Sequence, residues 1–433
     1  MRAAKRSVLD TLGCALHGST LEWGRILREV VAAEGSAPEV PVWGTALAVS
    51  PAQAALVNAT AGHSFELDDV HMGGMIHTGS LTVPTALAIG TRRGLDGRTL
   101  LAAVVAGCEV GARVGLAVGT AHFRTGFHPQ GTVGVFAAGA AAGRAAGFDA
   151  GVLHETLGIA GSQAAGLMAA QEGAMVKRLH SGRAAQSGVL SALLAERGFT
   201  GIPNVLEAGF GGFASAMGGG APDLVQLTDG LGERWETEDI GFKLFASCAA
   251  AQTSLDVVRR LREQHELRPD DVAAVHVHAS THAAVHCGWD YVPAGITAAQ
   301  MSIPYGVARM LLDGEVTAAG FTEETIGEPR AVELASRVAV IPDEGIDALG
   351  PMRRYTVRVE VETRGGRTVQ GTAADRPGSP EFPLSDEQLT AKFLDLAAPV
   401  VGDVAAGRIV ELVAELEGLA DTAQLTELLR RPS

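Results

Sequence analysis

Hydrophobic positions in the first half of the chain recur with the period of a helix. Leu9, Leu12 and Leu16 fall on one helical face near the start, and Thr99 stands where it can cap a helix that begins at Leu100. Segments with similar patterns predict further helices at 51–62, 82–93, 131–146, 151–170 and 183–197. Because no convincing alternating strand occurs before about residue 270, we expect the first half to be an all-α bundle.

The pattern changes to a period of two beyond that point. Residues 271–280 and 336–341 are typical of short strands, and residues 355–362 alternate apolar and polar side chains before Gly365 and Gly366. An alternating run followed by two glycines predicts a hairpin.

Helix signals also occur between and after these strands. Ser302 and Pro304 mark the start of a helix at 304–313, and Ser385 with Gln388 forms a capping box for a helix near the end of the chain. The chain is therefore expected to end as it begins, in helices.

This order of elements divides the chain into two domains. We predict a mainly α protein with an α+β lid: a large all-helical domain formed by both chain ends, residues 1–239 and 381–433, and a smaller inserted α+β domain, residues 240–380. Ligand pockets favour domain interfaces. Polar residues near the boundary of the two domains are therefore the candidates for chemistry.

Composition narrows the classes of partner and the compartment. Hydrophobic residues make up 47% of the 433 positions and charged residues 19%, which argues against disorder. The net charge of −15 repels phosphate backbones and anionic lipids, so we expect neither nucleic acid nor a membrane as a partner. The most apolar run, Thr132 to Ala142, is shorter than the ~20 residues that a bilayer requires. Four scattered cysteines without a CxxC pair indicate a cytoplasmic protein.

The densest polar cluster lies between residues 63 and 77. It combines three carboxylates and three imidazoles among closely spaced residues: His63, Glu66, Asp68, Asp69, His71 and His77. Such a set suits metal binding or acid/base chemistry, whereas the alternative is a helix end with capping carboxylates and exposed histidines. The surrounding glycines favour a ligand site.

Two further segments carry candidate chemistry. His128 precedes Pro129 and an Ala-rich helix, whose N-terminus favours bound anions, unless the histidine merely caps that helix. Lys177 and Arg178, followed by His180, form a basic pair that suits a carboxylate or an enolate, unless it is a solvated turn.

Two other features point away from metal and phosphate chemistry. Four histidines, at positions 276, 278, 282 and 286, resemble a metal tract, but they straddle a predicted strand and no cysteine or carboxylate completes the set. The glycine-rich stretch at 209–220 follows no strand and precedes no Walker lysine, so it predicts a mobile loop and not a phosphate loop.

Ordered blocks along nearly the whole chain carry a family resemblance. They are LDTLGCALHG (9–18), HSFELDDVH (63–71), HTGS (77–80), GFHPQGTVGVFAAGAAAGRAAG (126–147), KRLHSGRAAQSG (177–188), GFTG (198–201), KLFASC (243–248) and SIPYGVARMLLDG (302–314). In these blocks the sequence resembles the MmgE/PrpD family, which includes 2-methylcitrate dehydratase, cis-aconitate decarboxylase and an iminodisuccinate epimerase. The resemblance implies a helical domain with an α+β lid, a homodimer, and a site without metal or organic cofactor.

The same resemblance implies roles for individual residues. The residues that match a decarboxylase-type active site, and that we predict to be catalytic, are His77, His128, Lys177 and Tyr305. The residues predicted to bind substrate are Glu66, Asp68, Asp69, His71, Arg178, His180 and Gln252. The chain departs from the decarboxylase pattern with Glu66 for an aspartate, Val70 for a threonine and Gln252 for a histidine. Glutamine cannot titrate, which argues against cis-aconitate decarboxylation.

The reactions of this family share one physical problem, because negative charge develops beside a carboxylate. Our leading hypothesis is a cofactor-independent lyase that eliminates water from a hydroxylated di- or tricarboxylate. His128 or His77 would remove the α-proton, Lys177 would stabilise the enolate, and Tyr305 would protonate the leaving hydroxyl from the lid. The alternatives are an epimerase that transfers a Cα proton, a cis-aconitate-type decarboxylase, and an inactive dimeric binding protein.

Overall fold

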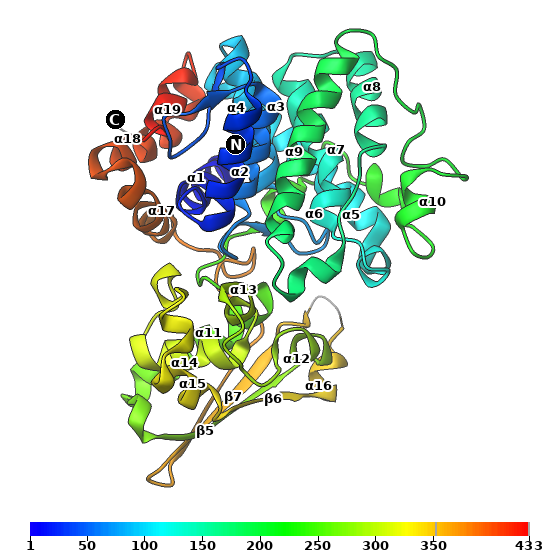
Figure 1. Cartoon of the computed structure of the whole chain (residues 1–433). Coiled ribbons are helices and arrows are strands. Elements are labelled where there is room, and N and C mark those ends of the chain that lie inside the picture. Colours follow the sequence, from blue (N-terminus) through cyan, green and yellow to red (C-terminus); the bar gives the residue numbers. More distant parts are fainter. Residues whose placement is uncertain (351–352, 432–433) are drawn as a thin grey trace.

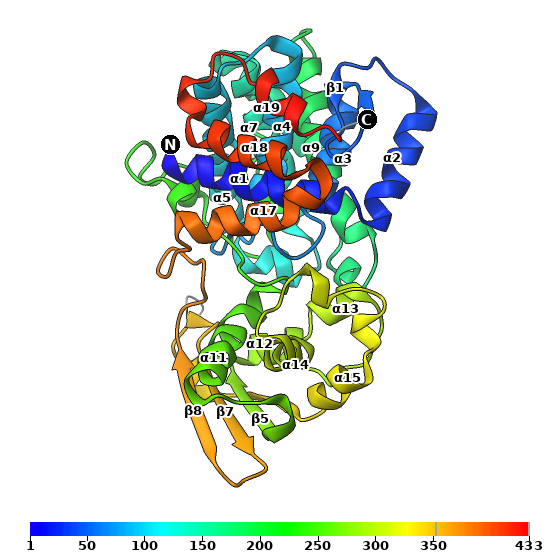
Figure 2. The same cartoon turned by 90° about the vertical axis from the view of Figure 1, so that its left-hand side faces the viewer.

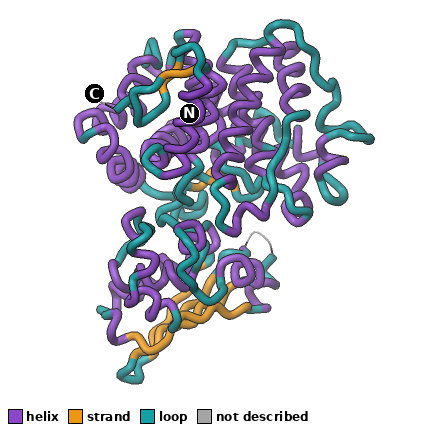
Figure 3. The backbone as a smooth tube through the Cα atoms, in the orientation of Figure 1, coloured by secondary structure: helices purple, strands orange, loops and turns teal. Residues whose placement is uncertain are grey.

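A large helical body lies above a smaller lid that contains the main sheet (Figure 1). The computed structural model describes residues 1–350 and 353–431; the last two positions of the predicted helical range lie outside the described residues. Helices dominate the body, and the strands longer than two residues, β5 to β8, lie in the lid (Figure 3). The predicted fold class, mainly α with an α+β part, is confirmed.

Both ends of the chain contribute helices to the body. Its helices are α1 (Arg2–Gly18), α2 (Glu22–Glu34), α3 (Pro51–Gly62), α4 (Gly79–Arg93), α5 (Gly97–Arg124), α6 (Pro129–Thr132), α7 (Gly134–Ala145), α8 (Ala150–Gly161), α9 (Val176–Ala195), α10 (Phe213–Met217), α17 (Asp386–Val401), α18 (Asp403–Ala414) and α19 (Ala423–Leu428). The late helix α17 packs along α1, as Figure 2 shows. The core of the body therefore combines residues from the first and last parts of the chain.

Small residues allow the body helices to approach closely. A Cβ atom at Gly107 of α5 would lie 2.5 Å from Cγ2 of Thr82 on α4 and 2.7 Å from the carbonyl oxygen of Ala137 on α7. The predicted capping box of Ser385 and Gln388 is present at the start of α17. The alanine- and glycine-rich sequence thus produces tightly packed helices instead of loops.

Three helices differ from their predicted bounds or caps. The helix expected at 151–170 ends at Gly161, and the one expected from 183 begins at Val176. Asp96, and not Thr99, caps α5: its carboxylate accepts a hydrogen bond from the backbone N–H of Thr99. The polar side chain before the helix is the one that can reach the free N–H groups of the first turn.

Helix α5 is long and apolar enough to cross a membrane by length and composition, so the expectation that no segment is long enough was wrong. Its 18-residue apolar window is 72% buried inside the protein, as expected of a core helix. Gly119 interrupts the helix with φ of 59°, and Glu109 pairs with Arg113 within it.

The lid is a four-stranded sheet with helices packed on it. Its elements are α11 (Ala249–His265), β5 (Val272–Ala279), α12 (Thr281–Cys287), α13 (Ile296–Gln300), α14 (Ile303–Asp313), α15 (Pro329–Ala335), β6 (Val338–Pro342), α16 (Glu344–Asp347), β7 (Val357–Thr363) and β8 (Thr368–Ala373). The strand order is β6-β5-β7-β8, with β5 parallel to β6 and the other pairs antiparallel. The buried faces of β5 and β7 pack in one core with α11 and α14.

The remaining elements are two pairs of two-residue strands and several short 3-10 turns. The small strands are β1 (Val40–Pro41), β2 (Ala48–Val49), β3 (Val70–His71) and β4 (Ile240–Gly241). The 3-10 turns are Met168–Glu172, Leu224–Leu227, Glu236–Asp239, Pro269–Asp271, Ala318–Gly320, Thr325–Gly327 and Leu416–Gly418. The antiparallel pairing of β3 with β4 has a functional consequence, because it brings the segment that leads into the lid beside the polar cluster at residues 63–77.

Candidate active site

A cavity of about 370 Å³ lies between the body and the lid. The body contributes His77, His128 and Lys177, and the lid side contributes Cys248, His286 and other polar side chains. This volume is within the range of small-molecule sites, and apolar side chains such as Met72, Met168 and Met301 line the cavity together with the polar groups. The cavity is therefore the candidate active site.

Glu66 is the centre of a buried group of charges at the floor of the cavity. Its carboxylate accepts hydrogen bonds from Lys177 and from Arg178, the latter at 2.7 Å, and Lys243 Nζ lies 3.4 Å away. Burial favours the neutral acid, but the three cations hold the pKa of Glu66 well below its usual range. Glu66 also has a φ of 54°, a conformation that a residue with a Cβ seldom adopts outside functional sites.

The charges at this floor do not cancel. Lys177, Arg178 and Lys243 supply three positive charges, whereas Glu66 and Asp68 supply two negative ones, which leaves an excess of one positive charge. An uncompensated buried charge is costly, so the site favours an anionic ligand. Lys177 and Lys243 both line the cavity and can meet such a ligand; burial lowers the pKa of Lys177, and Glu66 only partly restores it.

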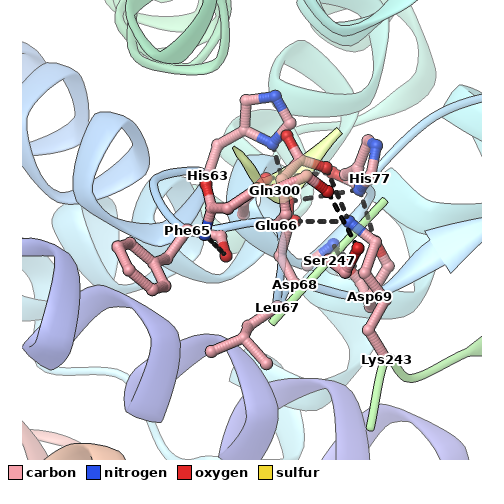
Figure 4. Close-up of polar contacts among 12 residues, drawn as sticks. His63, Phe65, Glu66, Leu67, Asp68, Asp69, His77, Lys243, Ser247 and Gln300 are labelled. Carbon is pink, nitrogen blue, oxygen red and sulfur yellow. Dashed lines mark hydrogen bonds and ion pairs between the residues drawn. The ribbon is translucent and has the colours of Figure 1, made fainter. Parts of the chain in front are cut away.

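Asp68 connects this charge group to two histidines (Figure 4). One of its oxygens lies 2.7 Å from Nδ1 of His63 and 3.2 Å from Nδ1 of His77, and the other lies 3.2 Å from Lys243 Nζ. The buried ring of His63 has a pKa of about 3, because desolvation outweighs the attraction of Asp68. His63 is therefore a neutral spacer that holds Asp68 in place.

The hydrogen bonds of His77 determine which of its nitrogens carries the proton. Its Nδ1 lies 2.6 Å from the backbone oxygen of Asp69, which can only accept, so Nδ1 is the donor. When the ring carries one proton, its lone pair is on Nε2, which makes no hydrogen bond to any of the described residues. Since His77 lines the cavity, Nε2 is a candidate base that faces the substrate.

Asp69 helps to hold the segment that carries His77. Its carboxylate accepts hydrogen bonds from the backbone N–H of Gly79, at 2.8 Å, and from the hydroxyl of Thr78, at 3.2 Å. Gln130 binds both backbone groups of His77, at 3.0 and 3.1 Å. His77 is thus fixed on both sides, and burial together with Asp10 and Asp68 raises the pKa of Asp69 to about 7.

His128 forms the next part of the cavity wall. Its Nδ1 lies 2.8 Å from Nδ1 of His180, so one ring donates and the other accepts. Burial, aided by the charges of neighbouring groups, holds the pKa of His128 well below its usual range. His128 is therefore neutral and a weak base, whereas His180 lies behind it and lines a second groove on the body.

The structure brings together only part of the predicted site. His77, His128, Lys177 and Glu66 line the cavity. Asp68, Asp69, Arg178 and His180 lie in a layer behind it and contact those residues. These positions agree with supporting roles better than with direct substrate binding.

The prediction that Tyr305 shares this cavity was wrong. Its ring is completely buried in the lid core, and its hydroxyl donates to the backbone oxygens of Gly320, at 2.7 Å, and Thr325, at 3.0 Å. Tyr305 does not line the cavity, whereas Tyr355 does. A buried hydroxyl between two acceptors has no proton to offer a substrate.

Gln252 and His71 are also not placed for substrate contact. The amide of Gln252 bonds to the backbone of Leu244, Phe245 and Ser247, so it shapes the segment between Lys243 and Cys248. His71 is buried: its Nδ1 accepts from the N–H of Gly74 and its Nε2 lies 3.1 Å from Glu236. Both residues are structural supports, and their predicted substrate-binding roles are corrected.

Sequence reasoning assigned no role to several cavity residues. They are Lys243, Cys248, His282, His286, Arg354 and Tyr355. Lys243 could have been found from the sequence, because a lone lysine between Phe242 and Leu244 in an apolar run is expected to be buried only if it is paired with an acidic group. Among the histidines set aside as a metal tract, His282 and His286 stack at 5.7 Å on α12 and face the cavity.

Among the residues that the structure describes, three groups of side chains have donor atoms close enough to surround a metal ion. They are His63, Asp68 and His77; His71, Glu236 and Asp239; and Cys248, His286 and Cys287. The last set corrects the expectation that no cysteine stands near the lid histidines. In the first two sets, a hydrogen bond between a histidine and a carboxylate, His63–Asp68 and His71–Glu236, accounts for the close approach of those two members without an ion.

Comparison with known proteins gives matches over both parts of the fold. Models of the MmgE/PrpD N-terminal and C-terminal domains match residues 1–224 and 245–417. The chain is 30% identical over 452 residues to a cis-aconitate decarboxylase of Aspergillus terreus (strain NIH 2624 / FGSC A1156), covering 100% of this chain and 92% of the relative. It is also 30% identical over 449 residues to the human cis-aconitate decarboxylase, covering 100% of this chain and 91% of the relative.

A third relative is the cis-aconitate decarboxylase-like protein oryM of Aspergillus oryzae (strain ATCC 42149 / RIB 40). It is 30% identical over 454 residues, which cover 99% of this chain and 92% of the relative. The similarity therefore spans the body, the lid and the cavity between them.

Proposed function

The chain belongs to the MmgE/PrpD family of enzymes, and from this premise we propose that it is a lyase that eliminates water from a hydroxylated di- or tricarboxylate. The observation that carries the proposal is a histidine of fixed orientation beside buried cations: His77, whose Nδ1 donates to the backbone oxygen of Asp69, lines the same cavity as Lys177 and Lys243. Such a pair can remove a proton next to a carboxylate and stabilise the enolate that results.

His77 is the base in this proposal, and His128 is not. The Nδ1 of His77 is fixed as the donor, which leaves Nε2 free to accept the α-proton. His128 is held neutral by burial and shares its Nδ1 with His180, so it is suited to orienting a substrate carboxylate or hydroxyl. Lys177 and Lys243 meet the developing negative charge from a region shielded from water.

The departing hydroxyl requires a proton donor other than Tyr305. Its hydroxyl is held between two carbonyl oxygens of the lid core. The donor must therefore be sought among the lid residues that line the cavity.

The second candidate function is decarboxylation of cis-aconitate, which the names of the relatives favour. Loss of carbon dioxide also produces an enolate-like charge, which the same lysines would stabilise. Decarboxylation needs no base to remove an α-proton, however, and the fixed tautomer of His77 favours proton abstraction. Elimination of water is therefore the first choice.

One screen separates these reactions. The purified protein is incubated in deuterated water with hydroxylated di- and tricarboxylates and with cis-aconitate, and products are followed by NMR and by the absorbance of a new conjugated double bond. Loss of water supports the proposal. Release of carbon dioxide from cis-aconitate supports the second candidate, and deuterium exchange without net conversion indicates an epimerase.

Ligand binding without any of these reactions would contradict both candidates and favour the binding protein. The cytoplasmic location, the homodimer and the independence from cofactors stay predictions of the sequence.

A further inference from the structure

The lid side of the cavity holds a pair of reactive groups that the proposed function has not used. Cys248 and His286 both line the cavity, and their ligating atoms, together with the sulfur of Cys287, lie within 4.8 Å of one another. The ring of His286 and the sulfur of Cys287 therefore both lie beside the sulfur of Cys248. His286 and Cys287 are neighbours at the end of α12, whereas Cys248 stands at the start of α11, and they meet because α12 packs against α11.

The position of Cys248 favours a negative charge on its sulfur. Cys248 is the N-cap of α11, a helix of 17 residues, so its side chain lies at the positive end of the helix. The sulfur of Cys287, which is completely buried, lies within 4.8 Å of the Cys248 sulfur on the protein side. Cys248 itself is 8% exposed, which leaves it reachable from the cavity.

The charged and titratable groups around the pair come from every neighbouring element. They are His282 and Cys287 on α12, Lys243 in the segment before α11, Tyr355 before β7, Glu66 on the cavity floor and Lys177 on α9. The proximity of Cys287, followed by that of His286, holds the pKa of Cys248 well below its usual range despite burial. Burial lowers the pKa of His286, but the adjacent Cys248 raises it above the ordinary value.

We propose that Cys248 and His286 form a thiolate–imidazolium pair, and that the imidazolium of His286 is the proton donor on the lid side of the cavity. This inference rests on the proposed function. His286 would be the residue that touches the departing hydroxyl, and Cys248 would be a positioning residue that keeps the proton on His286.

The proton count of the reaction then closes. His77 Nε2 takes the α-proton as the carbon–oxygen bond breaks, and His286 gives its proton to the departing hydroxyl, which leaves as water. The substrate loses one hydrogen and one hydroxyl, and no electrons leave the system. His77 then returns one proton to water and His286 takes one from water, which restores both groups.

Alkylation of the cysteines tests the pair without turnover. The protein is treated with iodoacetamide from pH 5 to 9, and peptide mass spectrometry follows each of the four cysteines. We expect Cys248 to react at a nearly constant rate down to pH 6. The buried Cys14 and Cys108 are internal controls that should react slowly at every pH.

The variant His286→Gln sharpens this result. At pH 6 we expect it to lower the alkylation rate of Cys248 by roughly tenfold or more, because an ordinary thiol is mostly protonated there. The control His276→Gln replaces a half-buried histidine on β5 outside the cavity lining and should leave the profile unchanged.

Activity measurements complete the test. His286→Gln should lower kcat roughly 10²-fold or more with little change in KM, and Cys248→Ser should shift the alkaline limb of the pH profile to lower pH, because His286 then loses its proton more readily. A Cys248 rate that falls tenfold per pH unit below pH 8 would overturn the proposal, as would alkylation only after a chelator is added. If the protein is an active lyase but the alkylation rate of Cys248 has the pH dependence of an ordinary thiol, only this inference is contradicted. If Cys248 reacts as a thiolate at pH 6 but no substrate is turned over, only the proposed function is contradicted.

Discussion

The two walls of the cavity are built differently. On the body side, Glu66, Asp68 and Lys177 are almost completely buried, and each is fixed by charged partners. On the lid side, His282 is exposed and His286 is half-buried. The body thus holds its charges in place before a substrate arrives, whereas the lid offers groups that remain close to water.

This difference suggests a division of labour. Charge stabilisation is most effective where water is excluded and the dipoles are already oriented, which describes the floor around Lys177. Proton delivery must be renewed in each cycle, which is easier for a histidine near solvent. Variants on the two walls should therefore fail in different ways.

The largest effect is expected from Lys177→Met on the body wall. The variant removes the cation that meets the enolate, and Glu66 keeps only Arg178 and Lys243. We expect kcat/KM to fall by roughly 10³-fold or more, with both kcat and KM affected, in steady-state assays on the carboxylate that the screen identifies.

The matched control is Arg183→Met, an exposed cation on the same helix α9, which should change activity by less than about twofold. If Lys177→Met is folded by circular dichroism and keeps activity within tenfold of the wild type, the body wall does not hold the charge of the reaction.

The next effect concerns the base. His77→Gln should lower kcat by roughly 10²- to 10³-fold and abolish deuterium exchange at the α-carbon, because glutamine cannot take the proton. His128→Gln should retain exchange, since His128 is assigned to orienting the substrate. NMR in deuterated water measures both variants, with His154→Gln on the surface of α8 as a control.

Loss of exchange in His128→Gln together with retained exchange in His77→Gln would reverse the two assignments. The cavity would then use the more deeply buried histidine as its base, against the burial that holds its pKa low.

A smaller, contrasting pair of effects is expected from two tyrosines. Tyr305→Phe should destabilise the fold by about 1–3 kcal/mol, because two buried carbonyl oxygens lose their donor, yet leave kcat within about threefold. Tyr355→Phe should change activity up to about tenfold with little loss of stability, because Tyr355 lines the cavity. Urea unfolding and kinetics on both variants measure the contrast; a severe kcat loss in folded Tyr305→Phe would restore the original assignment.

The case of Tyr305 shows where prediction from sequence stops. Its helix α14 was predicted well, because Ser302 and Pro304 mark the start and Gly314 the end. The alternating positions Val357, Val359 and Val361 likewise identify β7, since burial on one face repeats every second residue. These signals are local. Where α14 lies relative to the cavity depends on how it packs against α11 and β6, and its local sequence pattern does not determine this.

The same limit explains the residues that were missed. Cys248 and His286 become neighbours only when α11 packs on α12, so neither carries a signal in its own segment. The end of α8 at Gly161 is similar: the following segment includes Gly166 with φ of 150°, which a helix cannot accommodate. The cluster from His63 to His77 was found because its members are close in sequence and polar in an apolar region.

The smallest effect tests the support behind His77 through the pH dependence of stability. The pKa of Asp69 is about 7 in the folded protein against 3.8 for an unperturbed aspartate. Between these pH values the folded state keeps a proton that the unfolded state has released. The contribution of Asp69 is therefore fully present below pH 3.8 and is lost as pH rises through about 7.

Asp69→Asn should remove this dependence, because the amide does not titrate in this range. In urea unfolding at pH 5 to 8, the difference in unfolding free energy between wild type and variant should fall with pH, by up to about 1 kcal/mol per unit. Asp96→Asn is the control: the backbone N–H of Thr99 lowers the pKa of Asp96, so its contribution is lost only in acid and should be flat over this range. If the difference in unfolding free energy for Asp69→Asn also does not change with pH, the carboxylate of Asp69 is already ionised at pH 5. The segment that holds His77 would then carry a full buried negative charge.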